Sequence, residues 1–259
     1  MSAQAHEPPL LEVRDLRTYF KTDDGIVKAV DGVSFALRPG QTLGVVGESG
    51  SGKSTIGLAL LGYARRGARI TTGRVEIDGT DVLSLDDAAL RQARGTLVAH
   101  IPQDPAAALN PALSIGRQLR ETLTDHHLHD GGHDAACADA MRAVGLPDEP
   151  AFLERYPHQL SGGQQQRICI AMAFACHPRV IVLDEPTTGL DVTTQARVLA
   201  LVTDLCRRYE VGALYISHDL AAVSSLADRV LVLYAGRVAE LGPQADVLRQ
   251  PAHPYTRAL

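Results

Sequence analysis

Residues 47–55 have the types and the spacing of a loop that binds phosphate groups. They read Gly47-Glu48-Ser49-Gly50-Ser51-Gly52-Lys53-Ser54-Thr55 and fit the pattern GxxxxGK[ST]. The glycines permit backbone angles that aim successive N–H groups at a phosphate, Lys53 offers a cation to the β- and γ-phosphates of a nucleotide, and the Ser54 hydroxyl is a ligand for Mg²⁺. The apolar run Thr42–Val46 predicts a strand before the loop, and a helix is expected from Lys53 to about Tyr63. The phosphates would then lie at a helix N-terminus, which favours anions.

Two carboxylates follow a second apolar strand. Asp184 and Glu185 come directly after Val180–Leu183. Because ligands of open α/β sheets bind at the carboxyl ends of the strands, both side chains are expected beside the phosphate loop. There Asp184 would hold Mg²⁺, and Glu185 would orient and polarise the attacking water. The loop and the carboxylates together predict a hydrolase that uses ATP and Mg²⁺.

Two further polar residues follow predicted strands. Gln103 comes after Leu97–Ile101, where it would reach Mg²⁺ and the water, and His218 comes after Ala213–Ser217, where it would donate a hydrogen bond to the γ-phosphate. Either residue alone would be an ordinary surface or capping residue. Their order relative to the other motifs indicates a catalytic role for both.

The elements that must position these residues alternate between strands and helices. Strand-like runs at 11–16, 33–37, 74–77 and 229–234 join those named above, whereas residues 104–177 show helical spacing, as in 114–128 and 134–144. This pattern predicts a single α/β domain over residues 1–259, with a parallel core sheet and a helical subdomain inserted at 104–177. The longest apolar runs, such as Ile168–Cys176, are about half of the roughly 18–20 residues that a membrane span needs.

A third motif, Leu160-Ser161-Gly162-Gly163-Gln164, lies between the phosphate loop and the carboxylates. With it, the chain resembles the ATPase subunit of an ABC transporter, which implies a P-loop NTPase fold with an N-terminal antiparallel β part. In that family the motif caps the γ-phosphate of the opposite subunit's nucleotide, so the resemblance implies a head-to-tail dimer with two ATP molecules between phosphate loop and signature. It also implies that Asp191 communicates between the subunits. Phe20 would stack on adenine, with Tyr19 as second choice; a merely packed aromatic at a strand end is the alternative for Phe20.

The finer resemblance is to the peptide and nickel importers. Its motifs are Gln103-Asp104-Pro105, Leu109-Asn110-Pro111, the run 184–193 and His253-Pro254-Tyr255-Thr256-Arg257-Ala258-Leu259. It implies a bacterial importer of oligopeptides, dipeptides or nickel chelates. The implied partners are two transmembrane permease subunits, a second ATPase subunit that is either identical or a paralogue, and, indirectly, an extracytoplasmic substrate-binding protein. The chain would act at the cytoplasmic face of the inner membrane.

Two other functions share some of these features. An ATPase of this branch can serve a soluble multi-enzyme complex such as carbon–phosphorus lyase, but the motif at 103–111 favours the importer. An ATPase that acts on DNA would need a long coiled-coil insertion or a basic surface, and the net charge of −5 with a pI near 6.0 argues against a nucleic-acid partner. Residues 251–259 resemble the start of the branch's C-terminal extension, so we expect either a naturally short subunit or a truncated chain.

The tract Asp125–Asp134 contains His126, His127, His129 and His133 among glycines and aspartates. It has three interpretations: a solvated connector between two helices, an adventitious metal-binding tract, or a dedicated metal site. The connector is favoured because importer substrates are not expected to contact the ATPase.

Overall fold

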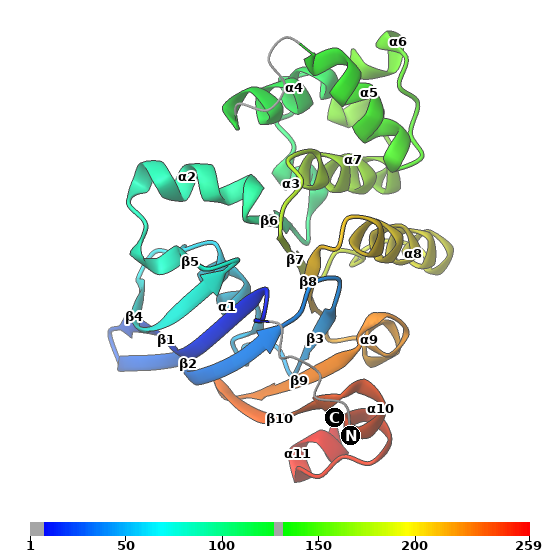
Figure 1. Ribbon diagram of the computed structural model, residues 1–259. Helices are drawn as coiled ribbons and strands as arrows, with labels where there is room; N and C mark the ends of the chain where they lie inside the picture. The colour runs from blue at the N-terminus through cyan, green and yellow to red at the C-terminus, as the bar shows by residue number, and fades with distance from the viewer. Residues whose placement is uncertain (1–7, 127–131) are drawn as a thin grey trace.

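Two β-sheets form the centre of the chain in the computed structural model, which describes residues 8–126 and 132–259 (Figure 1). The smaller sheet is antiparallel and contains, in spatial order, β2 (Gly25–Leu37), β1 (Leu11–Thr22), β4 (Ala68–Ile77) and β5 (Thr80–Asp81). Its strands are longer than predicted. The predicted segments 11–16, 33–37 and 74–77 are the halves with alternating burial, whereas residues 25–28 are all exposed and show no alternation that the sequence could reveal.

The larger sheet contains the strands that precede the phosphate loop, Gln103, Glu185 and His218. In spatial order it contains β10 (Arg237–Pro243), β9 (Arg229–Tyr234), β3 (Thr42–Val46), β8 (Gly212–Ile216), β7 (Val180–Asp184) and β6 (Val98–Ile101). All neighbours run parallel except β10, which is antiparallel to β9. The predicted parallel core and antiparallel N-terminal part are therefore confirmed. The edge strand β10 was not predicted, since none of its residues is fully buried.

In the described part of the chain, six helices surround the two sheets. They are α1 (Lys53–Leu60), α2 (Asp87–Thr96), α8 (Val192–Arg208), α9 (Leu220–Leu226), α10 (Gln244–Arg249) and α11 (Pro254–Ala258), with a 3₁₀ turn at Val82–Ser84. Helix α1 packs against strands of both sheets. It ends before the predicted Tyr63, because Gly62 has a φ of 60° and the Tyr63 N–H turns back to the carbonyl of Leu58 at 3.0 Å.

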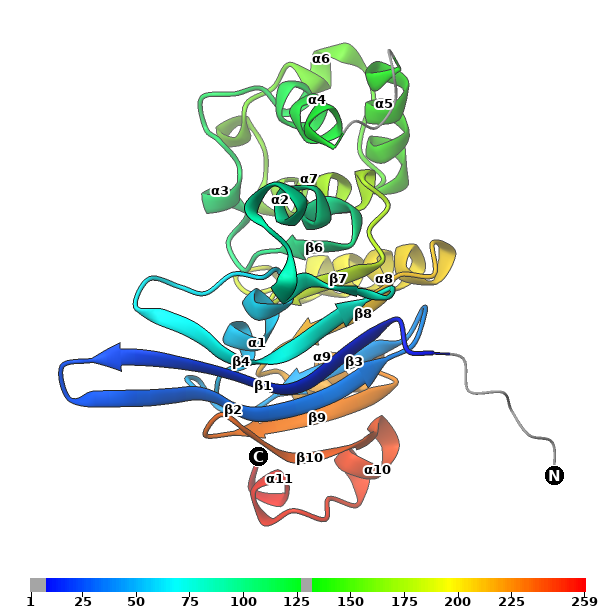
Figure 2. The same cartoon turned by 60° about the vertical axis from the view of Figure 1, so that its left-hand side comes forward.

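The helices between β6 and β7 form a separate lobe, drawn above the sheets in Figures 1 and 2. They are α3 (Pro105–Ala108), α4 (Ile115–Asp125), α5 (His133–Ala143), α6 (Pro150–Leu153) and α7 (Gly162–Ala175), with a 3₁₀ turn at Pro157–Gln159. Fully buried Leu119, Met141 and Ile168 lie between α4, α5 and α7. We propose residues 104–177 as the limits of this subdomain.

Half of the histidine tract lies outside the described residues. Helix α4 ends at Asp125 and α5 begins at His133, close to the predicted ends, and residues 127–131 of the tract fall in the gap between the described ranges. Within 8–126 and 132–259 no group of three or more His, Cys, Asp or Glu side chains could hold a metal ion. In the same ranges no helix is both long enough and apolar enough to cross a membrane.

Candidate active site

The phosphate loop follows β3 directly and is shaped by two glycines that no other residue could replace. Gly47 has a φ of 150°, and a Cβ there would lie 2.2 Å from the carbonyl oxygen of Leu233. Gly52 has a φ of 107°, and a Cβ there would lie 2.1 Å from the carbonyl oxygen of Ala29. The backbones of strands β2 and β9 therefore lie in close contact with the outer side of the loop. Helix α1 begins immediately afterwards, so its N-terminal N–H groups border the loop.

Lys53 is folded into this loop. Its Nζ donates hydrogen bonds to the carbonyl oxygens of Gly47 at 2.7 Å and of Glu48 at 2.8 Å, and only 6% of the residue is exposed. Burial lowers the pKa of Lys53, while the nearby carboxylates of Glu185 and Asp184 act in the opposite direction. A cation held in this way suits a phosphate bound in the loop, as the sequence predicted.

Ser54 and Asp184 meet across the sheet edge. The Ser54 hydroxyl donates to Oδ1 of Asp184 at 3.0 Å, although the residues are 130 positions apart in the chain. Hydroxyl and carboxylate oxygens are the hard ligands that Mg²⁺ prefers. The donor set beside the phosphate loop therefore fits a magnesium ion.

Glu185 is the centre of a second cluster. Its Oε2 accepts hydrogen bonds from Nε2 of Gln103 at 3.0 Å and from the Thr188 hydroxyl at 3.2 Å, and Nδ1 of His218 lies 2.9 Å from its Oε1. Its backbone adopts a φ of 48°, a left-handed conformation that is rare for a non-glycine residue and frequent at functional sites. Sequence reasoning predicted Gln103, Glu185 and His218 as a set but gave no sign that Thr188 contacts the carboxylate.

One cavity of about 920 Å³ brings together most of the loop with Gln103, Glu185 and His218, whereas Asp184 and Thr188 are not among its lining residues. It is lined by Phe20, Val27, Lys28, Ala29, Ser49, Gly50, Gly52, Lys53, Ser54, Thr55, Arg65, Gln103, Glu185, His218, Ala235 and Gly236. Phe20 lies in its wall as predicted for the adenine contact, whereas the hydroxyl of Tyr19 is bound elsewhere, to Asp31. The contributions of β2 and of the turn at 235–236 were missed, because nothing in their composition distinguishes them from other turns and exposed strands.

The signature residues do not line this cavity. Ser161 is the N-cap of α7: its hydroxyl accepts from the Gln164 N–H at 3.3 Å, and the Gln164 side chain accepts from the Ser161 N–H at 3.0 Å. Ser161 and Gly162 are exposed, so the signature is presented to the outside of its own chain. Asp191 is likewise outside the cavity, where it caps α8 by accepting from the Thr194 N–H at 3.0 Å.

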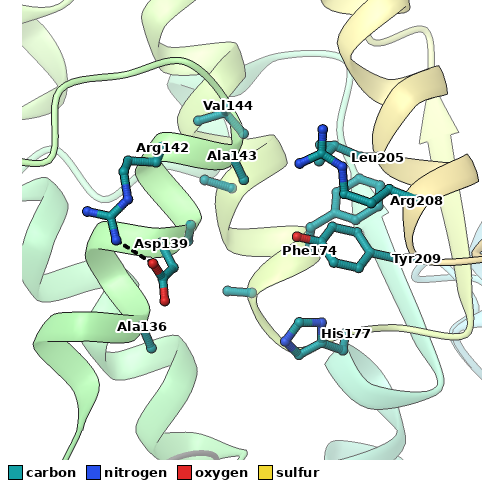
Figure 3. A pocket seen from close by; sticks show the side chains of 13 residues that line it. Ala136, Asp139, Arg142, Ala143, Val144, Phe174, His177, Leu205, Arg208 and Tyr209 are labelled. Carbon is teal, nitrogen blue, oxygen red and sulfur yellow. Dashed lines mark hydrogen bonds and ion pairs between the residues drawn. The ribbon is translucent and has the colours of Figure 1, made fainter.

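A separate cavity of about 460 Å³ lies between α5, α7 and α8 (Figure 3). On one side Arg142 and Asp139 form an ion pair, and on the other Tyr209 lies between Phe174 and His177, with ring centroids 6.4 Å and 5.6 Å away. None of the predicted site residues lines it. Nothing therefore connects this smaller cavity with the motifs.

A buried carboxylate, Asp31, connects Tyr19, the neighbour of Phe20, with the turn at 235–236. Asp31 on β2 is 4% exposed at its side chain; its Oδ1 accepts from Tyr19 at 2.7 Å and Arg17 at 3.1 Å, and its Oδ2 accepts from Arg237 at 2.7 Å. The hydrogen bond from Tyr19, followed by that from Arg237, lowers the pKa of Asp31 to about 2. Its backbone N–H also donates to the carbonyl of Gly236 at 2.8 Å, in the turn that borders the phosphate loop.

Asp31 should therefore make the free energy of unfolding depend on pH in the acid range. Because the folded state holds this carboxylate ionised below its ordinary pKa near 4, its contribution is fully present above that value and is lost as the pH falls toward about 2. We expect Asp31→Asn to lower the free energy of unfolding at pH 7, with a difference from the unaltered chain that shrinks below pH 4 in urea titrations. Asp15→Asn, which alters an exposed partner of the same Arg17, is the control. A difference that does not vary with pH would contradict this role.

Comparison with known proteins agrees with this geometry. Residues 30–188 match the family model described as ABC transporter. The dipeptide transport ATP-binding protein DppD of Haemophilus influenzae is 43% identical over 254 residues, which cover 96% of this chain and 76% of that protein. The oligopeptide transport ATP-binding protein OppD of Salmonella typhimurium is 44% identical over 264 residues, covering 100% and 78%.

Solved structures show the same fold. The ATP-binding cassette MJ0796, in a dimeric post-hydrolysis state bound to ADP and Pi, matches with a TM-score of 0.79 and 26% identity over 90% of this chain and 98% of that one. The structure of cbiO1 from Clostridium perfringens matches with a TM-score of 0.80 and 24% identity over 94% and 92%, which supports the fold. Motifs, cavity, relatives and fold agree: this chain belongs to the ABC transporter family, as one of its nucleotide-binding, ATP-hydrolysing subunits.

Proposed function

We propose that the chain hydrolyses MgATP to power a bacterial importer of peptides, working in a dimer of ATPase subunits on the cytoplasmic face of the inner membrane. The observation that carries the proposal is the cluster around Glu185, where Gln103 and His218 converge on one carboxylate beside the phosphate loop. The cargo class is supported by relatives at 43–44% identity that are named for dipeptide and oligopeptide transport.

Binding and positioning account for most of the chemistry. The loop N–H groups, the N-terminus of α1 and Lys53 bind and orient the phosphates, and Phe20 stacks on the adenine. Ser54, Gln103 and Asp184 would hold Mg²⁺, which neutralises charge that develops on the phosphate oxygens. In phosphoryl transfer such positioning and charge stabilisation supply nearly all of the rate enhancement.

Glu185 acts on the water. Its Oε1 and Oε2 are fixed by His218, Gln103 and Thr188, so the carboxylate has a defined direction. It accepts a hydrogen bond from the attacking water and so polarises it in line with the γ-phosphate, while His218 donates to a γ-phosphate oxygen. Gln103, whose amide donates to Glu185, would reach both the water and Mg²⁺ and would couple the binding of the two.

The signature completes the site of a second subunit. Ser161 caps α7, and Gly162 and Gly163 begin it, where the N-terminal N–H groups suit an anion. Ser161 and Gly162 are exposed, Gly163 is half-buried, and none of the three lines the cavity of its own chain. A partner subunit, either an identical copy or a paralogue, would bring its signature over this chain's γ-phosphate. Asp191 caps the neighbouring helix α8. It would communicate between the two ATP sites of the dimer whether ATP has been hydrolysed.

A groove next to Gln103 suits the permease. A cavity of about 430 Å³ is lined by Leu61 and Tyr63 after α1, by Pro102, and by residues of α3 and α7 such as Ala108 and Met172. Pro102 precedes the catalytic Gln103 directly, and Tyr63 is 48% exposed. A helix of a transmembrane subunit could dock here. Any shift of Gln103 during ATP binding or hydrolysis would then be transmitted to that helix. The substrate-binding protein would contact only the permeases.

Co-purification tests the proposal. The chain should be isolated from native membranes in mild detergent, and the proteins that co-elute should be identified by mass spectrometry. Two polytopic membrane proteins are expected, with or without a second subunit that carries an LSGGQ motif. Recovery with a soluble multi-enzyme assembly, and with no membrane protein, would contradict it.

A further inference from the structure

The C-terminal segment 251–259, which the mechanism above does not use, lies beside the phosphate loop. Its short helix α11 follows β10 and α10 at the edge of the parallel sheet (Figures 1 and 2). The backbone N–H of Glu48 donates a hydrogen bond to the hydroxyl oxygen of Tyr255 at 3.0 Å, across 207 positions of sequence. A side chain of the last helix therefore contacts the backbone of the nucleotide site directly.

Glu48 is held from both sides. Its carbonyl oxygen accepts from Nζ of Lys53 at 2.8 Å and from the N–H of Ser51 at 3.1 Å, both inside the loop. Its N–H points the other way, to Tyr255. The peptide groups that flank Glu48 are thus fixed between the cation that meets the phosphates and a phenol outside the loop. Without the phenol, residues 47–51 would lose their only hydrogen bond to a side chain outside the loop among the described residues.

The Tyr255 ring is itself held in place. It packs on Tyr234 at the end of β9, with ring centroids 4.4 Å apart, and its backbone N–H donates to Nδ1 of His253 at 3.1 Å. The segment before it is fastened to β10, because the carboxylate of Glu240 accepts from the N–H groups of Ala252 at 2.9 Å and His253 at 3.1 Å. These bonds, that from Ala252 foremost, lower the pKa of Glu240. The phenol therefore approaches the loop from a fixed support.

We propose that Tyr255 is a positioning residue for ATP binding: through the N–H of Glu48 it holds the phosphate loop in its binding conformation before the nucleotide arrives. A loop ordered in advance loses less conformational entropy when it binds, so the affinity is higher. The inference rests on the nucleotide site of the proposed function and not on the cargo, so it can fail while peptide import stands.

Tyr255→Phe removes only the hydroxyl and tests the proposal in the purified full chain. The probe is N-methylanthraniloyl-ATP with Mg²⁺, followed by fluorescence titration. A net contribution of about 0.5–1.5 kcal/mol for one hydrogen bond corresponds to a dissociation constant raised roughly 2- to 10-fold. The KM for ATP should rise by the same factor while kcat and the melting temperature of the nucleotide-free chain stay unchanged.

Tyr234→Phe is the matched control, since it removes the neighbouring hydroxyl and leaves both rings in contact. It should bind the probe as the unaltered chain does. A second variant, Glu240→Ala, removes the hydrogen bonds that fasten residues 252–253 to β10. In that background Tyr255→Phe should lower the affinity for the probe less than it does in the unaltered chain. Unchanged affinity in Tyr255→Phe would overturn the proposal. An equal loss of affinity in Tyr234→Phe would also overturn it. So would a loss of affinity in Tyr255→Phe that is accompanied by a lower melting temperature, because both results indicate general destabilisation.

Discussion

Glu185→Gln is expected to leave ATP binding intact, to abolish turnover and to trap a nucleotide-bound dimer. Glutamine has the same shape and can still accept hydrogen bonds from Gln103 and Thr188, so the cavity should keep its form. What is lost is the negative charge that polarises the water, and general-base catalysis contributes roughly 10²- to 10⁴-fold to a rate. Phosphate release should fall by that factor, while size-exclusion chromatography with MgATP should show the dimer.

The control for this variant is Glu210→Gln. Glu210 is exposed, lies outside the cavity and shares the unusual positive φ, 54° against 48° for Glu185, so it reports any backbone effect of the substitution alone. Its phosphate release should equal that of the unaltered chain. Full ATPase activity in Glu185→Gln would remove Glu185 from the role proposed for it.

Lys53→Ala is expected to weaken nucleotide binding strongly. The ammonium group is the only lysine cation in the loop, and it also ties the carbonyls of Gly47 and Glu48 together. Hydrogen bonds to a charged group are worth about 1.5–3 kcal/mol each, so the affinity for ATP should fall by roughly 10- to 100-fold or more. Equilibrium titration with the fluorescent ATP analogue measures this loss.

Lys21→Ala serves as the comparison, because Lys21 is an exposed lysine on β1 that does not line the cavity. Its affinity for ATP should not change. Since turnover in Lys53→Ala would be limited by binding and turnover in Glu185→Gln by chemistry, the two variants separate the two functions of the site. Equal affinity in Lys53→Ala and the unaltered chain would show that the loop binds phosphate by its N–H groups alone.

The sequence predicted those parts of the site that are encoded locally. The phosphate loop needs glycines at fixed positions, and Asp184 and Glu185 need only a buried strand in front of them, so short motifs carry both. Gln103 and His218 were found because parallel strands end at one edge of the sheet, which the structure confirms by their contacts with Glu185. Their roles in catalysis, like those of the signature and Asp191, remain proposals.

The parts that sequence reasoning missed come from long-range contacts. The outer half of β2 is exposed and lacks the alternation that marks a strand, yet Lys28 and Ala29 line the cavity. The turn at 235–236 and the phenol of Tyr255 reach the loop from the other end of the chain, and no local pattern records which distant backbone a side chain will contact. Such contacts follow from the tertiary fold and become visible only with it.

Peptide uptake in the native host tests whether this chain powers peptide import. A mixture of radiolabelled dipeptides and oligopeptides should be supplied to cells whose chromosomal copy carries Lys53→Ala, Glu185→Gln or the control Glu210→Gln, with the amount of chain at the membrane measured in parallel. We expect cells with either site variant to lose uptake of at least one peptide class, while cells with the control take up peptides normally. Normal uptake of every peptide in the site variants, with the chain present in normal amounts, would contradict it.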